Sequence, residues 1–208
     1  TNIKYLKDNN VKIWDSWADE NGDLGPVYGH QWRHFNAPYI DRNTDYSNKG
    51  IDQLDNLIKQ LKDPKQRTSR RLIISAWNPC QIKEMALPPC HVLMQFNVRE
   101  NKYLSCSLYQ RSGDVGLGVP FNIASYSFLT HIIATHCDLI ADEFVHFIGN
   151  AHIYEDHIDT LKLQIERTPM SFPKITLQNK HNSINDYDIN DLSWIEEYKH
   201  HPTLKMKM

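Results

Sequence analysis

Two segments with alternating apolar and polar residues, 91–98 and 104–109, most strongly constrain what this chain can fold into. An alternation with a period of two is typical of a β-strand that buries one of its faces. The polar face of the second segment, which includes Arg111 if the strand continues that far, is polar enough to line a site. The apolar rows are Val92, Met94, Phe96 and Val98 in the first segment, and Leu104, Cys106 and Leu108 in the second.

Helical periodicity is found in three other segments. Residues 51–61 place an apolar side chain at every third or fourth position, and Asp63-Pro64 predicts the end of this surface helix. Residues 122–139 carry two neighbouring apolar rows, so we expect a central buried helix there. Residues 157–166 predict a second amphipathic helix.

Short runs of branched and aromatic residues predict further strands at 71–76, 144–148 and 174–178. Polar turns follow the last of these through residue 190, and no internal repeat is present. We therefore expect an α+β fold in which helices pack on a mixed β-sheet.

Composition limits the class of protein. With 208 residues, 40% of them hydrophobic, the chain can form one sizeable core, so we expect a single domain. The formal net charge of -2 provides no global basic field for nucleic acid, and an anionic ligand would need a local arginine site. No apolar run approaches the roughly 18 residues that cross a bilayer, and residues 1–4 do not resemble a secretory signal. We expect a soluble protein of the cytoplasm.

The cysteines point to free thiols. The chain has 4 of them, Cys80, Cys90, Cys106 and Cys137, with no C-x-x-C spacing. In a reducing compartment such cysteines stay unpaired, so we expect neither a disulfide scaffold nor a metal site.

Cys90 is the best candidate for a nucleophile. Pro88-Pro89 fix the approach of the chain to it, although a lone cysteine is more often a small buried hydrophobic residue. His91 is a poor base for Cys90 because successive strand residues point to opposite faces. Arg111 could instead stabilise a thiolate and hold a substrate anion. A thiol, a guanidinium and the amide of Asn122 suit attack on a ring that carries a phosphate.

Two other polar positions each have two readings. Arg70 and Arg71, beside Arg67, form the only dense arginine cluster and could bind phosphate or form a solvated turn. Asn122 could cap the apolar helix, or its amide could donate and accept hydrogen bonds at once.

Asp114 lies between Gly113 and Gly116 and could be an ordinary turn residue. His152 and Tyr154 would lie on one side of an extended segment, where they suit a sugar hydroxyl. A histidine satisfied within the core is the commoner case.

Five stretches occur in the order found in the folate-dependent thymidylate synthase family, which the chain resembles over essentially its whole length. They are Trp14–Gly29, Met85–His91, Tyr109–Tyr126, Ala151–Tyr154 and His201-Pro202. The resemblance implies an α+β catalytic domain over residues 1–208 that forms a sheet-to-sheet homodimer. It also implies that the family's N-terminal segment, with a glutamate and a phosphate-binding arginine, precedes the first residue given.

The activity implied by the resemblance is reductive methylation of dUMP to dTMP with 5,10-methylenetetrahydrofolate as cosubstrate. By similarity, Cys90 is the nucleophile that adds to carbon 6 of uracil, which makes carbon 5 able to take the one-carbon unit. Tyr28 matches a tyrosine associated with removal of the proton on carbon 5, and Arg111 acts beside Cys90. The resemblance implies no metal and no need for nucleic acid.

The remaining roles are also carried over from the resemblance. The implied dUMP ligands are Arg111, Ser112, Asn122, His152 and Tyr154, with Arg70 and Arg71 lent to the neighbouring subunit. The implied folate-facing residues are Trp14, Trp77, Asn78, Asp114, Leu117, Gly118 and Phe121.

Two other functions remain open on the sequence. One is a deoxycytidylate hydroxymethylase of the same family. Asn122 argues against it, because an amide matches the N–H and oxo groups of uracil whereas a carboxylate would suit cytosine. The other is a noncatalytic module that binds nucleotide or RNA.

Overall fold

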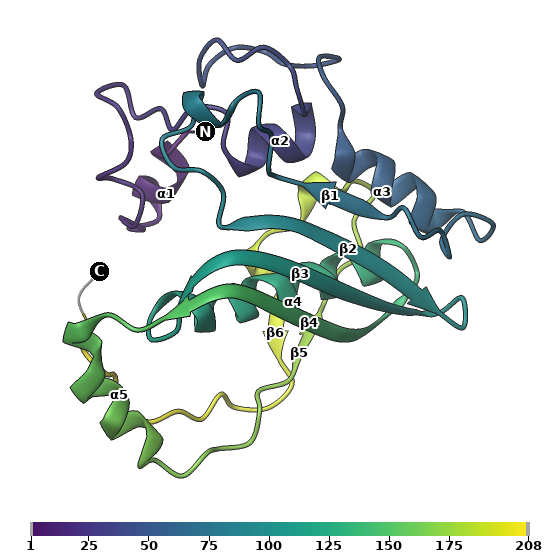
Figure 1. Ribbon diagram of the computed structural model, residues 1–208. Coiled ribbons are helices and arrows are strands. Elements are labelled where there is room, and N and C mark those ends of the chain that lie inside the picture. Colours follow the sequence, from purple (N-terminus) through teal and green to yellow (C-terminus); the bar gives the residue numbers. More distant parts are fainter. Residues whose placement is uncertain (1, 207–208) are drawn as a thin grey trace.

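The computed structural model describes residues 2–206 (Figure 1). Residues 1, 207 and 208, the ends of the predicted domain, lie outside the described residues. The α-helices are α1 (Lys4–Asp8), α2 (Tyr28–His34), α3 (Gln53–Lys62), α4 (Gly118–His136) and α5 (Ile158–Ile165). The strands are β1 (Ile73–Ser75), β2 (His91–Arg99), β3 (Tyr103–Asp114), β4 (Ile140–His152), β5 (Ile175–Leu177) and β6 (Leu192–Trp194). Short 3-10 helices are η1 (Ile82–Glu84), η2 (Glu155–His157), η3 (Ile184–Asp186) and η4 (Ile189–Asp191).

A mixed sheet forms the centre of the molecule. Its order is β1-β2-β3-β4, with antiparallel pairing from β1 to β3 and parallel pairing between β3 and β4. A long crossover is needed to join parallel neighbours, and α4 provides it. The predicted α+β class with a mixed sheet is confirmed.

The core lies on one face of this sheet. The alternation predicted for 91–98 and 104–109 is confirmed, and Leu104, Cys106 and Leu108 are all 0% exposed. Side chains from α3 and α4 complete the cluster: Leu57, Ile58 and Leu61 from α3, and Tyr126, Ile133 and Ala134 from α4. Figure 1 shows α4 behind the sheet, whereas no helix of the described chain covers the face turned to the viewer.

The prediction of a central buried helix is wrong in part. The helix spans Gly118–His136 and ends before Leu139. Its second half reaches the core through Ile133, but Phe121 and Ile123 near its start are exposed. The two apolar rows of this helix cover more of its surface than the sheet can bury. The pattern therefore predicted burial of one side of the helix that no other described residues cover.

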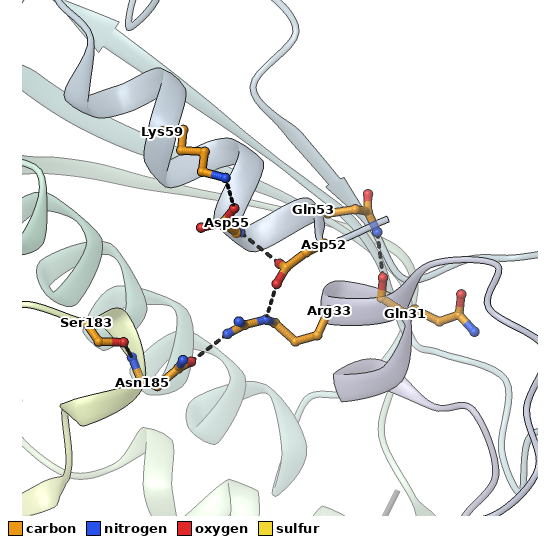
Figure 2. A network of polar contacts seen from close by, with 8 residues as sticks. All are labelled: Gln31, Arg33, Asp52, Gln53, Asp55, Lys59, Ser183 and Asn185. Carbon is orange, nitrogen blue, oxygen red and sulfur yellow. Dashed lines mark hydrogen bonds and ion pairs between the residues drawn. The ribbon is translucent and has the colours of Figure 1, made fainter. Parts of the chain in front are cut away.

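The predicted surface helix at 51–61 is confirmed as α3, which begins with a side-chain cap. Asp52 accepts a hydrogen bond from the Asp55 backbone N–H at 2.9 Å. The same carboxylate accepts from Arg33 Nε on α2 at 2.9 Å, and Arg33 also donates to Asn185 Oδ1 at 2.6 Å. Figure 2 shows this chain of contacts joining α2, α3 and η3. The C-terminal segment is thereby tied to the helices that precede the sheet.

The C-terminal part is only partly as predicted. The helix expected at 157–166 is present as α5, but none of its residues is buried. The strand expected at 174–178 is β5, and it pairs with β6, which the sequence pattern did not indicate. Figure 1 shows this hairpin on the α4 side of the sheet.

Candidate active site

Cys90 lies at the entrance to β2, where the strand pairing is irregular. The register of β2 against β3 shifts between His91 and Leu93, and the Cys90 carbonyl accepts a hydrogen bond from the Arg111 backbone N–H at 2.8 Å. Such bulges re-aim side chains and often occur beside active sites. The thiol is free and half-buried. The alternative of a small residue sealed in the core, which describes Cys106, does not fit Cys90.

The Arg111 guanidinium is fixed against the two prolines that precede Cys90. Its Nε donates to the Pro89 carbonyl at 3.0 Å and its Nη2 to the Pro88 carbonyl at 2.8 Å. The guanidinium carbon lies 5.9 Å from the ring centroid of Trp77. Because a guanidinium has five N–H donors, two bonds to the chain leave others for an anion. The extension of β3 through Arg111 thus brings the predicted thiol and cation together.

Tyr28 is held against the same point of the chain. Its hydroxyl oxygen accepts hydrogen bonds from the backbone N–H of Cys90 at 2.8 Å and of His91 at 3.3 Å. Burial raises the pKa of Tyr28, so the phenol keeps its proton at neutral pH. Trp14 packs edge-on against Tyr28 with ring centroids 6.4 Å apart. Trp14, Tyr28 and Cys90, far apart in the sequence, are therefore neighbours.

A tight turn lets Tyr28 reach Cys90. Gly25 has φ +72°, and a Cβ there would lie 2.1 Å from the Glu84 carbonyl oxygen. The Ala86 N–H donates to the Leu24 carbonyl at 2.9 Å, which joins the segment before α2 to the segment before Cys90. Only glycine combines this conformation with so close an approach.

Asn122 is not a helix cap, since α4 begins at Gly118 and has Leu117 as its N-cap residue. Its Oδ1 accepts a hydrogen bond from Gln110 Nε2 at 3.0 Å, and Gln110 Oε1 pairs with His146 Nε2 at 2.7 Å. Burial lowers the pKa of His91 to about 4, so this ring is neutral at pH 7, and it also hydrogen-bonds Asn122. The helix-cap reading of Asn122 is therefore wrong, and its reading as a ligand-facing amide stays a prediction.

The turn between β3 and α4 uses Asp114 as a structural acceptor. Its carboxylate accepts from the backbone N–H of Gly116 at 3.0 Å and of Gly118 at 3.3 Å. The turn reading of Asp114 is therefore confirmed, and its predicted contact with folate stays a prediction. Beside this turn is a cavity of about 720 Å³, with Leu117, Phe121, Arg167, Tyr198 and His201 among its lining residues. Its size and mixed lining suit a large, partly apolar ligand.

His152 and Tyr154 lie together at the end of β4. Their ring centroids are 5.3 Å apart and the rings are perpendicular. His152 Nδ1 lies 3.2 Å from Asn150 Oδ1, which orients the imidazole. The strand pairing places Asp114 opposite His152 and Ser112 opposite Asn150, so the predicted sugar ligands border the segment predicted to bind phosphate and folate.

Three predicted ligands lie apart from this group. Arg70 and Arg71 are exposed just before β1, at the other edge of the sheet from β4. Asn78 is buried, and its Nδ2 donates to Gln81 Oε1 at 2.9 Å and Gln31 Oε1 at 3.2 Å. The amide of Asn78 thus serves an interior network that also holds α2, and its predicted contact with folate stays a prediction.

Two residues of this arrangement were not predicted from the sequence. Gln110 and His146 lie behind Asn122, on the face of the sheet that packs against α4. A signal was present, because Gln110 continues the apolar row of Leu104, Cys106 and Leu108 and a polar residue in such a row must find partners. His146 stands between Phe144 and Ile148 in the same way.

Comparison with known proteins decides the family. The family model described as thymidylate synthase matches residues 1–208. The chain belongs to the thymidylate synthase family, whose members are methyltransferases. Human thymidylate synthase is 50% identical over 220 aligned residues, which cover 100% of this chain and 69% of the human protein.

Two bifunctional relatives extend the comparison. The dihydrofolate reductase-thymidylate synthases of Plasmodium chabaudi and Plasmodium berghei (strain Anka) are each 48% identical over 221 residues. These alignments cover all of this chain but 37% of each relative. The similarity therefore concerns the synthase region of those proteins. Within residues 2–206 no helix is long and apolar enough to cross a membrane, and no group of three or more His, Cys, Asp or Glu side chains could hold a metal ion.

Proposed function

We propose that this protein converts dUMP to dTMP by reductive methylation with 5,10-methylenetetrahydrofolate in the cytoplasm. The observation that carries the proposal is the fixed neighbourhood of Cys90, Arg111 and Tyr28, in a chain of this family. A half-buried thiol beside a guanidinium held by two carbonyls can attack a ring whose phosphate the same cation binds.

Each residue has a distinct part in this reaction. The Cys90 sulfur bonds to carbon 6 of uracil, and the electron pair of the ring double bond moves towards carbon 5 and the 4-oxo group. The cosubstrate, when bound, supplies the one-carbon unit and the reducing hydride. The proton on carbon 5 passes to a water molecule, which the Tyr28 hydroxyl, itself protonated and fixed near Cys90, holds by a hydrogen bond. Loss of that proton expels the folate nitrogen from the transferred carbon. Addition of the hydride to that carbon then expels the Cys90 sulfur and restores the ring double bond.

The substrate is held at both ends. Arg111 and Ser112 bind its phosphate, Asn122 pairs with the uracil edge, and His152 with Tyr154 binds the sugar hydroxyl. Arg70 and Arg71 of a neighbouring subunit complete the phosphate site in a homodimer. The cavity beside Leu117 and Phe121 receives the folate, where Arg167 and His201 provide polar contacts at its border.

The test uses dUMP tritiated at carbon 5. Tritium release that depends on methylenetetrahydrofolate is expected from the wild-type protein and is expected to be abolished in Cys90→Ser, while calorimetry still detects dUMP binding to the variant. A covalent complex of the wild type with 5-fluoro-dUMP and the folate should add the mass of both to the peptide containing Cys90.

Three results would contradict the proposal. Normal turnover by Cys90→Ser would remove Cys90 from the mechanism. A preference for dCMP would favour the hydroxymethylase. Failure of the complete polypeptide to form the covalent complex, with dUMP binding intact, would favour a noncatalytic nucleotide-binding module.

A further inference from the structure

A chain of polar side chains extends from half-buried Asn122 through buried Gln110 to half-buried His146. Gln110 on β3 is 2% exposed and donates from Nε2 both to Asn122 Oδ1 at 3.0 Å and to the Ser112 backbone carbonyl at 2.9 Å. Its Oε1 lies 2.7 Å from Nε2 of His146 on β4. Strand pairing sets His146 opposite Leu108, next to Gln110 along the same face.

The chemistry of these groups fixes the direction of every hydrogen bond. The Ser112 carbonyl can only accept, so the Gln110 atom that faces it must be the amide nitrogen. Gln110 Oε1 then faces His146, whose Nε2 must carry a proton. Burial lowers the pKa of His146, so the ring is neutral at pH 7 and its single ring proton lies on Nε2. Asn122 in turn must present Oδ1, an acceptor, to Gln110.

The orientation of the Asn122 amide decides which pyrimidine it can read. With Oδ1 held by Gln110, the Nδ2 donors point away from Gln110 and are available to a 4-oxo group. A cytosine offers a 4-amino donor instead, which meets another donor. His91 also hydrogen-bonds Asn122, so Gln110 is one of two restraints on this amide. If Gln110 lost its contact with His146, the Gln110 amide could rotate and its restraint on the Asn122 amide would be lost.

We propose that His146 is a positioning residue that determines the preference for a 4-oxo over a 4-amino pyrimidine nucleotide, through Gln110 and Asn122. The inference rests on the proposed function, because it assigns a role in the same nucleotide site. His146 does not touch the nucleotide. Removal of the Nε2–H donor leaves Gln110 Oε1 buried without a donor, and relief of that penalty drives Gln110 into other orientations.

Two variants of His146 separate the hydrogen bond from packing. His146→Phe keeps a planar ring beside Phe144, whose ring centroid lies 5.3 Å from that of His146, but lacks the donor. His146→Gln keeps an N–H donor without the ring. His136→Phe is the matched control, since His136 is a buried histidine near the end of α4 that pairs with Lys62 Nζ at 2.9 Å rather than with Gln110.

The measurement is the ratio of kcat/KM for dUMP to that for dCMP, from tritium release at carbon 5, with dissociation constants for both nucleotides from calorimetry. We expect this ratio to fall about tenfold in His146→Phe, to recover in part in His146→Gln, and to stay at the wild-type value in His136→Phe. A general structural defect would lower kcat for dUMP and leave the ratio unchanged.

An unchanged ratio in His146→Phe overturns the inference. If His146→Phe does not fold, Gln110→Met tests the same link, because it removes the amide and keeps the side-chain volume; an unchanged ratio there also overturns it. Wild-type protein that neither binds nor turns over dUMP would contradict the proposed function instead. The two failures are therefore distinguishable.

Discussion

If the amide of Asn122 pairs with the uracil edge as proposed, a carboxylate in its place changes the preferred substrate. In Asn122→Asp the side chain can still accept from Gln110 Nε2, now 3.0 Å from Oδ1, but it can no longer donate to a 4-oxo group. We expect the ratio of kcat/KM for dUMP to that for dCMP to fall by about 100-fold, since a lost donor leaves the oxo group unpaired. Steady-state kinetics with both nucleotides measures this ratio.

Asn182→Asp is the control for this prediction, because it makes the same chemical change at an exposed position between β5 and β6. Its ratio should equal that of the wild type. If Asn122→Asp keeps the wild-type preference for dUMP, the amide does not read the pyrimidine edge.

The sequence indicated the individual reactive residues better than the residues that support them. Cys90 and Arg111 carry chemistry in their side chains and stand beside Pro88-Pro89 and Ser112-Gly113, so their motifs were visible. Gln110 and His146 act only through a partner on another strand. Their places in apolar rows signalled that each needs a partner, but the pairing of β3 with β4 decides which partner it is, and no local pattern predicts that pairing.

The segment from Leu24 to α2 depends on Gly25. An alanine there would combine φ +72° with a Cβ 2.1 Å from the Glu84 carbonyl oxygen. We expect Gly25→Ala to lower the free energy of unfolding by about 1–3 kcal/mol and to reduce turnover more than dUMP binding, because Tyr28 is displaced from Cys90. Urea denaturation and steady-state kinetics measure the two effects.

Gly29→Ala provides the comparison within the same segment. Gly29 lies inside α2, and nothing is found within 4 Å of a Cβ built there. Alanine favours a helix over glycine by about 0.5–1 kcal/mol, so this variant should be as stable as the wild type or slightly more stable. Equal losses of stability and turnover in Gly25→Ala and Gly29→Ala would show that the close approach of Gly25 to Glu84 causes neither loss.

The β5–β6 hairpin contains a carboxylate that makes stability depend on pH. Asp191 accepts hydrogen bonds from the Asp188 backbone, from Asn179 Nδ2 at 3.0 Å and from His181 Nε2 at 2.9 Å. The Asp188 backbone bond is the largest cause that lowers the pKa of Asp191 from 3.8 to about 2. Since the folded state holds the carboxylate ionised, its stabilising contribution is full above about pH 4 and is lost as the pH falls towards 2.

Asp191→Asn should therefore unfold with a weaker pH dependence than the wild type between pH 4 and pH 2. The measurement is the free energy of unfolding in urea at several pH values across this window. Parallel curves for the two proteins would show that Asp191 does not carry the acid sensitivity.

Helices and strands whose apolar residues recur with a regular period could be predicted from the sequence. Strands that form because another strand lies beside them could not. α3 and the apolar rows of β2 and β3 follow from periods that one buried face imposes. β4 is longer than the apolar run at 144–148 because its pairing with β3 continues on both sides of that run, through Ala141 before it and polar Asn150 after it. β6 forms because β5 is beside it, so its three residues carried no pattern of their own.

At the scale of the whole molecule, the uncovered face of the sheet is the clearest unexplained surface. Leu93, Tyr109 and Phe147 lie side by side across β2, β3 and β4, and Ile73 and Val145 lie on the same face. Isolated exposed apolar residues are normal, but a contiguous row on one sheet face is typical of an interface. This surface suits the sheet-to-sheet homodimer expected from the family resemblance, with Arg70 and Arg71 exposed beside its β1 edge.

Phe147→Asp tests both the dimer and its role in the active site. The side chain is 57% exposed on the uncovered face, so the folded subunit tolerates a carboxylate there, whereas a dimer would have to bury that charge against apolar neighbours. We expect light scattering to report a monomer and turnover of dUMP to be lost, because Arg70 and Arg71 no longer reach the neighbouring phosphate site. Phe172→Asp makes the same change at a phenylalanine that is 93% exposed between α5 and β5, and should remain dimeric and active. The two variants carry the same added charge, so a difference between them reports on the position of that charge. If Phe147→Asp is a monomer with full turnover, the interface is not needed for catalysis and the shared arginines have no part in the mechanism.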